Sequence, residues 1–296
     1  MEKKFILACE STVDMPYATV AARDIPVIFY TYVVDDVEYV DDMERDPQAM
    51  DRFYDFLKAG KMPHTSQINQ VTYEEFMEPL VQQGDLLFIA FGSGMSGSVN
   101  NAIRAGEALQ EKYPDRKVIV IDSLCSSTGY GMLVESAADM RDEGRGIDEC
   151  AQWVLANRNK VHHQFFCTDL TMFRRSGRIS GPTATLATIL NICPILRLNN
   201  EGRILSYDKV RGKKKAIAET VNQMVKHVQN GTDYDGKCYI CNARCIEDAE
   251  ALRDKVEETF PKLKGKVGIT NIGTIITSHC GQGIVAVFFY GDERLP

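Results

Sequence analysis

A segment rich in glycine and serine has the residue types and the context of an anion-binding turn. Residues 86–91 form an apolar run that predicts a buried strand, residues 92–97 read Gly-Ser-Gly-Met-Ser-Gly, and residues 99–112 have the pattern of an amphipathic helix. The N–H groups at a helix start have no partner inside the helix and, together with the helix dipole, favour a negative group. The segment is therefore a candidate site for a phosphate or carboxylate, while a tight turn without a ligand is the structural alternative.

The same turn leaves a second function open. Its glycines Gly92, Gly94 and Gly97 match the pattern G-x-G-x-x-G, and the next predicted strand is followed by Asp122. Dinucleotide-binding folds place their ribose-binding acid at about this position. Against this interpretation, serines alternate with the glycines and put hydroxyl groups where a pyrophosphate loop uses bare backbone. An NAD-dependent oxidoreductase is therefore the alternative function.

Three further segments could contact an anion or an apolar ligand. Residues 63–67 form a polar loop between predicted helices, which can cap a helix or face a ligand. Residues 273–283 form a glycine-flanked loop in which His279 can donate a hydrogen bond to a carboxylate. A basic run that includes Arg174 can neutralise a carboxylate or phosphate. The apolar residues 182–192 that follow predict a helix, either in the core or in the wall of an apolar cavity.

Other patterns argue against metal or nucleotide chemistry. Cys238, Cys241 and Cys245 have no second pair of ligands at metal-binding spacing, and in a strand the first two would face opposite sides. His162 and His163 likewise have no further ligands nearby in the sequence. No phosphate-binding loop, nucleophile elbow or kinase signature is present. We therefore predict no metal, no cofactor and no catalytic residue, and hence a binding protein rather than an enzyme.

Composition and charge limit the function further. The chain has 296 residues, 44% of them hydrophobic, with a formal net charge of −7. This charge disfavours nucleic acid and anionic membranes as general partners. The apolar run at residues 5–9 is too short for a signal peptide or a membrane helix. Nine cysteines are scattered along the chain, and we interpret them as reduced thiols of a cytoplasmic protein.

The elements that position these residues predict two α/β domains. In the first half, strands at 5–9, 27–34, 86–91 and 118–121 alternate with helices at 48–59, 73–81, 99–112 and 129–141, which indicates a mostly parallel sheet with flanking helices. Thr72 and Glu75 fit a capping box for the second helix. In the second half, six strands at 165–168, 194–198, 204–210, 237–241, 267–272 and 284–290 and helices at 214–229 and 246–260 predict a mixed α/β domain. We place the domains at 1–160 and 161–296, with residues 199–202 as a hairpin turn.

Taken together, the segments resemble the DegV family of bacterial fatty-acid-binding proteins along nearly the whole chain. The matching segments are residues 10–16 (D-S-T-x-D-x-P in the family), 65–67 (T-S-Q), 93–97 (S-x-x-S-G), 120–123 (V-I-D-S), 174–180 (R-x-G-G-R-I-S), 191–196 (N-I-x-P-I-L) and 211–216 (R-x-x-K-A). Three segments depart from the family pattern. Glu10 replaces the usual aspartate, residues 281–283 replace G-P-G, and residues 277–280 replace G-T-H-T while keeping His279.

This resemblance implies a fatty-acid site at the junction of the two domains. By the family's pattern, Thr65, Ser93 and His279 hold the carboxylate and Arg174 is a nearby cation, with Ser66, Ser96 and Gly97 as further ligand-binding residues. The resemblance also implies that a separate ATP-dependent kinase subunit can act on the bound acid, although a lipid carrier or sensor without a kinase fits equally well. The partner contact would lie at Arg211, Lys213, Lys214 and Lys215, where a solvated helix start is the structural alternative.

Overall fold

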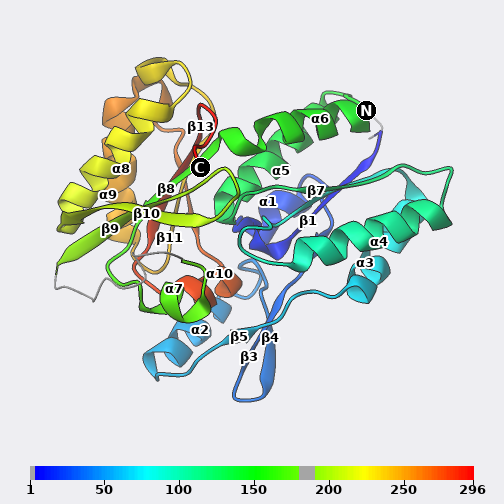
Figure 1. The fold of residues 1–296 in the computed structure, drawn as a ribbon, viewed down its shortest axis with the longest axis horizontal. Coiled ribbons are helices and arrows are strands. Elements are labelled where there is room, and N and C mark those ends of the chain that lie inside the picture. Colours follow the sequence, from blue (N-terminus) through cyan, green and yellow to red (C-terminus); the bar gives the residue numbers. More distant parts are fainter. Residues whose placement is uncertain (1–3, 180–190) are drawn as a thin grey trace. The chain divides into compact units, whose positions relative to one another are not determined.

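The computed structural model describes residues 4–179 and 191–296 (Figure 1). The predicted apolar helix at 182–192 lies outside the described residues except for its last two positions. The chain forms two compact units. The first unit comprises Met1–Ser126, Tyr130–Arg158 and Gly273–Ile275, and the second comprises Ser127–Gly129, Asn159–Ile272 and Ile276–Pro296.

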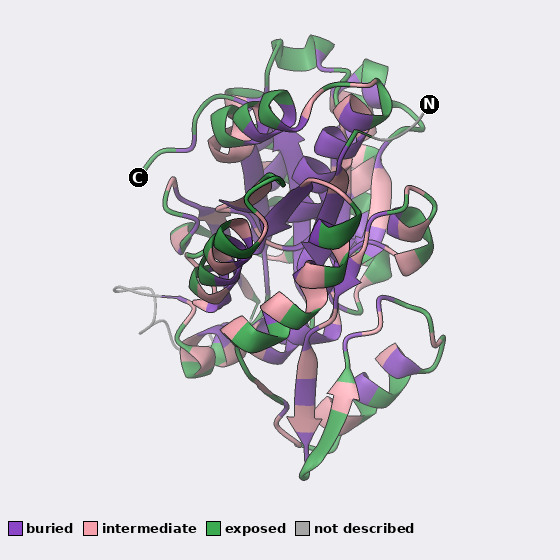
Figure 2. Ribbon diagram, turned by 90° about the vertical axis from the view of Figure 1, so that its right-hand side faces the viewer, coloured by how far each residue is buried: buried purple, intermediate pink, exposed green. Residues whose placement is uncertain are grey.

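A parallel sheet forms the centre of the first unit. Its strand order is β2-β1-β6-β7, and all three neighbouring pairs are parallel, as predicted. All five residues of β6 are buried. Figure 2, coloured by burial, shows buried strands in the interior of the protein. Strands covered on both faces are apolar throughout, which explains the unbroken apolar run. The strands are β1 (Ile6–Glu10), β2 (Val27–Ile28), β6 (Leu86–Ala90) and β7 (Val118–Asp122).

The prediction of one strand at 27–34 was wrong, because this run forms two strands in separate sheets. After β2, the N–H of Tyr30 donates to Ser11 Oγ (3.2 Å) and its carbonyl accepts from the N–H of Asp41 (2.9 Å). These bonds take the backbone out of the parallel ladder. It then enters a three-stranded antiparallel sheet, β3 (Thr31–Val34), β4 (Val37–Val40) and β5 (His64–Thr65). Asp35 and Asp36 both have positive φ and form the hairpin turn.

Helices flank the parallel sheet, and the four predicted ones are present with shifted ends. α3 begins at Gln70 rather than at residue 73, because Asn69 Oδ1 accepts the N–H of Thr72 (3.0 Å). The predicted capping box of Thr72 and Glu75 was therefore wrong. The helices are α1 (Tyr17–Ala21), α2 (Ala49–Lys58), α3 (Gln70–Gln83), α4 (Ser98–Lys112), α5 (Ser127–Asp142), α6 (Ile147–Asn157) and the short 3₁₀ turns η1 (Ser11–Val13) and η2 (Arg158–Lys160).

The second unit contains a six-stranded mixed sheet in the order β10-β9-β8-β13-β11-β12. Only β11 and β12 pair in parallel, and the turn at 199–202 joins β9 to β10 as an antiparallel hairpin, as predicted. All six predicted strands are present, although β8 begins at Val161 and ends at Phe166 rather than spanning the predicted residues 165–168. They are β8 (Val161–Phe166), β9 (Ile192–Leu198), β10 (Ile204–Arg211), β11 (Cys238–Asn242), β12 (Gly268–Asn271) and β13 (Val285–Tyr290).

Two long helices, α8 (Lys213–His227) and α9 (Ile246–Thr259), pack against each other and against this sheet (Figure 1). The shorter elements are α7 (Thr171–Ser176), η4 (Gly231–Asp233), η5 (Pro261–Leu263) and α10 (Thr274–Cys280). The prediction of a loop around His279 was wrong, because these residues form α10. In the described part of the chain, no helix combines the length and the apolar character needed to cross a bilayer.

Candidate functional site

The turn after β6 is fixed by close backbone contact with the loop after β7. The N–H of Gly92 donates to the carbonyl of Cys125 (3.0 Å), and a Cβ atom at position 92 would lie 2.7 Å from that oxygen. Only glycine fits this approach. The next residue, Ser93, is exposed and its N–H donates to Asp122 Oδ1 (3.0 Å). The turn therefore starts from a fixed point and presents Ser93 at the surface of the first unit. The N–H groups of Ser93, Ser96 and Ser98 are bonded within the protein, so the prediction that unpaired N–H groups of this turn bind an anion was wrong for these residues.

Asp122 has a structural role at this edge of the sheet. Its Oδ1 atom accepts the N–H groups of both Ser93 and Leu124, the latter at 2.9 Å. This carboxylate therefore joins the turns that follow two neighbouring parallel strands. These bonds account for the acid without a ribose, so the dinucleotide alternative loses one of the two features that favoured it, the other being the glycine pattern.

The polar loop after β5 lies against the glycine–serine turn. Ser98 Oγ accepts the N–H of Ile68 (3.2 Å), and Ser96 Oγ lies 3.2 Å from both the hydroxyl and the N–H of Ser98. A Cβ atom at Gly97 would lie 2.9 Å from the side-chain amide of Gln67. The first unit thus brings together the segments of Thr65 and Ser66 and of Ser93, Ser96 and Gly97, about 30 residues apart in the chain.

A buried acid, Glu10, supports this edge of the parallel sheet, a role that was not predicted from the sequence. Glu10, the last residue of β1, is 0% exposed. Its Oε2 atom accepts the N–H of Phe91 (2.7 Å), its Oε1 atom accepts the hydroxyl of Tyr73, and its own N–H donates to the hydroxyl of Tyr130 (3.0 Å). Burial raises the pKa of Glu10 to about 7, although the hydrogen bonds from Tyr73 and Phe91 act in the opposite direction.

Two further acids hold the start of α10 within the first unit. Asp14 Oδ1 accepts the N–H of Gly273 (2.9 Å), and Asp41 Oδ1 accepts both the N–H and the hydroxyl of Thr274 (3.0 and 2.7 Å). These bonds satisfy N–H groups that the first turn of a helix leaves without partners. The helix is therefore specified by residues more than 200 positions away, which explains why its own sequence reads as a loop.

The second unit joins the basic segment to the end of α10. Ser176 Oγ, at the end of α7, donates to the carbonyl of His279 (2.9 Å). Burial, followed by the positive charge of Arg178, lowers the pKa of His279 to about 4. The imidazole is therefore neutral at neutral pH and offers one N–H donor. Arg174 lies half-buried on α7, two residues before Ser176.

The basic residues at the start of α8 are exposed, but they are not equivalent. Lys213 Nζ lies 2.6 Å from Asp248 Oδ2 on α9, and this ion pair raises the pKa of Lys213. Its charge is therefore balanced locally. Arg211, at the end of β10, and Lys214 and Lys215, in the first turn of α8, are all exposed. These three residues form what we call the basic start of α8.

The candidate residues thus occur in two groups. Thr65, Ser66, Ser93, Ser96 and Gly97 belong to the first unit, and Arg174 and His279 belong to the second. The hydroxyl groups and the neutral imidazole are donors that suit a carboxylate.

Comparison with known proteins identifies the chain's relatives. The family model described as "Uncharacterised protein, DegV family" matches residues 4–292. The chain belongs to the DegV family. A DegV domain-containing protein of Clostridium perfringens is 37% identical over 297 residues, which cover 99% of this chain and 100% of the relative.

Solved DegV structures have the same fold. The fatty acid binding DegV family protein from Streptococcus agalactiae is 26% identical, with a TM-score of 0.81 and coverage of 99% of this chain and 100% of that one. The Streptococcus pneumoniae Fatty Acid Kinase (Fak) B3 protein loaded with linoleic acid is 21% identical, with a TM-score of 0.81 and coverage of 98% and 100%. The predicted two-part α/β architecture of the DegV fold is thereby confirmed.

Two of the acids whose structural roles were not predicted, Glu10 and Asp14, belong to the opening DegV motif. In this chain the motif begins at Glu10 and includes Asp14, and both acids bind backbone N–H groups rather than facing outward. Polar residues directly after a buried strand are the signal that could have indicated this role. Asp41 lies outside the motif, and only the fold reveals its contact with Thr274.

Replacing Glu10 by glutamine should change how stability depends on pH. The folded-state pKa of about 7 lies above the ordinary value of 4.5, so the folded protein retains a proton that the unfolded chain releases between these values. The wild-type free energy of unfolding therefore falls as pH rises through this window. Glutamine resembles the protonated acid and does not titrate. The free energy of unfolding of Glu10→Gln, relative to that of wild type, should therefore rise by on the order of 1–3 kcal/mol between about pH 5 and pH 8.

Urea unfolding at a series of pH values measures this difference. Glu75→Gln, on the exposed face of α3, is the matched control and should show no such trend. A difference between Glu10→Gln and wild type that stays constant across the window would show that Glu10 is ionised throughout.

Proposed function

We propose that this DegV protein binds a long-chain fatty acid, with the tail buried and the carboxylate held by Thr65, Ser93 and His279. The observation that carries the proposal is the end-to-end likeness to the Streptococcus agalactiae protein, which is a fatty acid binding DegV protein. The hydroxyl and imidazole donors among these residues are compatible with a carboxylate, because each can donate a hydrogen bond to it. Ser66, Ser96, Gly97 and Arg174 complete the proposed ligand-binding set.

Burial of the acyl tail of the fatty acid would supply most of the binding free energy, while hydrogen bonds to its carboxylate would orient it. Each buried methylene contributes about 0.8 kcal/mol, so a 16-carbon tail supplies on the order of 10 kcal/mol before ordering costs. The donors then need only offset the desolvation of the carboxylate. A neutral His279 fits this role, because it donates a hydrogen bond without forming a tight ion pair.

We further propose that the protein presents its fatty acid to a separate ATP-dependent kinase and has no catalytic machinery of its own. The likeness to the Fak B3 protein of Streptococcus pneumoniae supports this role. The proposed docking surface is the basic start of α8, where a positive cluster on a chain of charge −7 can attract an acidic partner.

We place this function in the cytoplasm. The structure describes all nine cysteines, and none of them forms a disulfide, which is consistent with a reducing compartment.

Protein purified from a bacterial host should carry a fatty acid. Denaturing extraction followed by mass spectrometry should recover close to one fatty acid per chain, and delipidated protein should take up added fatty acid. Titration with NAD on the same preparation tests the alternative function. Absence of lipid and of uptake, or saturable NAD binding that Asp122→Ala abolishes, would overturn the proposal.

Loss of a single head-group donor should weaken binding without unfolding the protein. Ser93→Ala and Thr65→Ala should each cost roughly 1–2 kcal/mol of binding free energy, because a buried carboxylate is left short of a donor. His279→Gln should weaken binding similarly and slow acyl-phosphate formation even more. Thr232→Ala, an exposed threonine on η4, is the control and should leave affinity unchanged.

Fluorescent fatty-acid titration and thermal unfolding measure these effects together. If a variant melts at a much lower temperature while its folded fraction binds lipid as tightly as wild type, that residue is structural and its assignment to the site is wrong.

Charge removal at the basic start of α8 should affect the kinase reaction alone. The double variant Arg211→Ala with Lys214→Glu should bind fatty acid normally but support slower ATP-dependent acyl-phosphate formation with the cognate kinase at limiting concentration. The difference should be largest at low salt and shrink as salt screens the attraction. Lys264→Ala with Lys266→Glu makes the same change in net charge at another exposed position and should not slow the reaction. Equal turnover of both double variants would show that the basic start of α8 is only a solvated helix end.

A further inference from the structure

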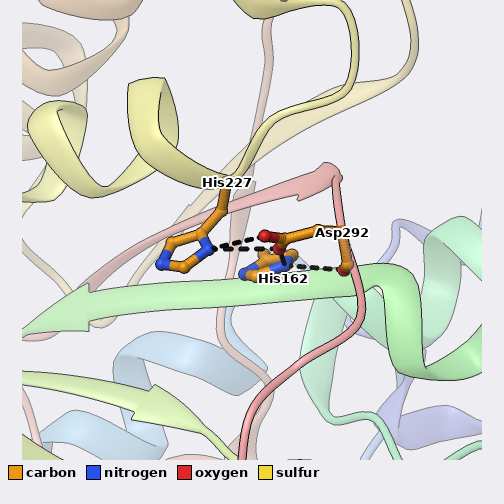
Figure 3. A group of neighbouring side chains, drawn as sticks. All are labelled: His162, His227 and Asp292. Atoms are coloured by element: carbon orange, nitrogen blue, oxygen red, sulfur yellow. Dashed lines mark hydrogen bonds and ion pairs between the residues drawn. The ribbon is translucent and has the colours of Figure 1, made fainter.

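A second group of polar side chains lies in the second unit and includes none of the residues assigned to the fatty acid. His162 comes from β8, His227 is the last residue of α8, and Asp292 follows β13. Figure 3 shows the three side chains pointing toward one another. Asp292 Oδ1 lies 3.0 Å from His162 Nε2 and 3.1 Å from His227 Nδ1. The sequence-based expectation that His162 has no further ligands was wrong, because its partners are 65 or more residues away along the chain.

The backbone around these side chains holds them in position independently of their own contacts. The N–H of Gly291 donates to the carbonyl of Lys160 (2.8 Å), and the N–H of Asp292 donates to the carbonyl of His227 (2.9 Å). A Cβ atom at Gly291 would lie 2.3 Å from the His227 oxygen and 2.8 Å from His162 Cδ2, so only glycine allows this approach. The close packing of three elements therefore fixes the cluster before any ligand binds.

The geometry suits a small cation. One ligand atom from each residue lies within 4.8 Å of the others. In a tetrahedral zinc site with bonds of about 2.0–2.1 Å, neighbouring ligand atoms lie about 3.3–3.4 Å apart. The observed nitrogen–oxygen distances of 3.0–3.2 Å are slightly shorter. The His162 and His227 rings stack at a centroid distance of 4.9 Å with 20° between their planes, and His162 Nε2 also lies 3.0 Å from the Asp292 carbonyl. One imidazole ring must therefore rotate, in addition to the small increase in spacing, before both nitrogens can face a common ion.

Accessibility and charge also shape the site. The His162 side chain is 5% exposed and that of Asp292 is 59% exposed, so an ion can enter from the Asp292 side and keep a water ligand there. Asp292 supplies one negative charge, whereas the buried guanidinium of Arg294, bonded to Asn159 Oδ1 (3.0 Å), adds a positive charge in the same region. Because the charges of Asp292 and Arg294 act in opposite directions on a bound cation, we expect the site to bind the ion with moderate affinity, more weakly than a structural zinc site.

We propose that His162, His227 and Asp292 form a binding site for a divalent transition-metal ion of the zinc type, with water as the fourth ligand. Two imidazole nitrogens and one carboxylate oxygen are the ligands that such ions take in open sites. When the ion binds, each imidazole carries its proton on its other nitrogen. The ion cross-links β8, the end of α8 and the segment after β13, and thereby stabilises the second unit.

The test uses full-length protein without a histidine tag, treated with a chelator and then exchanged into chelator-free buffer. Calorimetric titration with Zn²⁺ should show one ion per chain, and Zn²⁺ should raise the melting temperature. Co²⁺ should give the intense visible absorption of a four-coordinate site. His227→Gln and Asp292→Asn should each weaken Zn²⁺ binding by at least about tenfold. His64→Gln, which removes an exposed histidine on β5, should leave binding unchanged.

The outcomes separate a metal site from a hydrogen-bonded cluster. If wild type binds no Zn²⁺, or binds it no better than His227→Gln and Asp292→Asn, the three residues only hold the elements together and the proposal is wrong. Melting curves recorded without metal show whether each variant folds. Should one of them fail to fold, the other variant and the Co²⁺ spectrum of the wild type decide the question.

Discussion

The arrangement of the first unit depends on one buried carboxyl group. Glu10 ends β1, accepts the N–H of Phe91 at the end of β6 and accepts the hydroxyl of Tyr73 on α3. Leaving any of these groups unpaired in the interior would cost on the order of 1–3 kcal/mol, so the three elements are locked together. Asp122, at the end of β7 on the other side of β6, makes a similar bond to the N–H of Ser93. Polar side chains at the carboxyl ends of parallel strands therefore fix the turn that carries the proposed ligand groups.

The acids at this edge thus bind the protein's own backbone, whereas the residues that we assign to the ligand are hydroxyls and an imidazole. Asp14 and Asp41 bind the start of α10, and this helix continues to His279. A carboxylate that accepts backbone N–H groups is held in one orientation and adds rigidity. The hydroxyl of Ser93 is exposed by comparison, and its backbone alone serves the turn. This division of roles is compatible with the anionic head group that we propose as the ligand.

Local sequence patterns predicted most of the fold, because the strands and helices are set by apolar periodicity and by turn residues. The errors arose where distant residues decide the structure. The break after Ile28 depends on Ser11 and Asp41, and α10 depends on Asp14 and Asp41. The same limit applies to the sites. The glycine–serine turn was visible in the sequence, whereas the bonding of Glu10 and the cluster around Asp292 join residues from separate elements, which no local pattern reveals.

The burial of the Glu10 carboxyl group has an electrostatic consequence. Burial raises the pKa of Glu10 to about 7, so a large share of molecules hold this group neutral at physiological pH. Its partner Phe91 lies two residues before Ser93, so under the assignment that we propose a charged Glu10 would repel the carboxylate of a fatty acid at this turn. A proton on Glu10 removes that repulsion. The ligand carboxylate in turn should favour the protonated acid. If Ser93 holds the carboxylate as proposed, head-group binding and the protonation of Glu10 are linked, and each promotes the other.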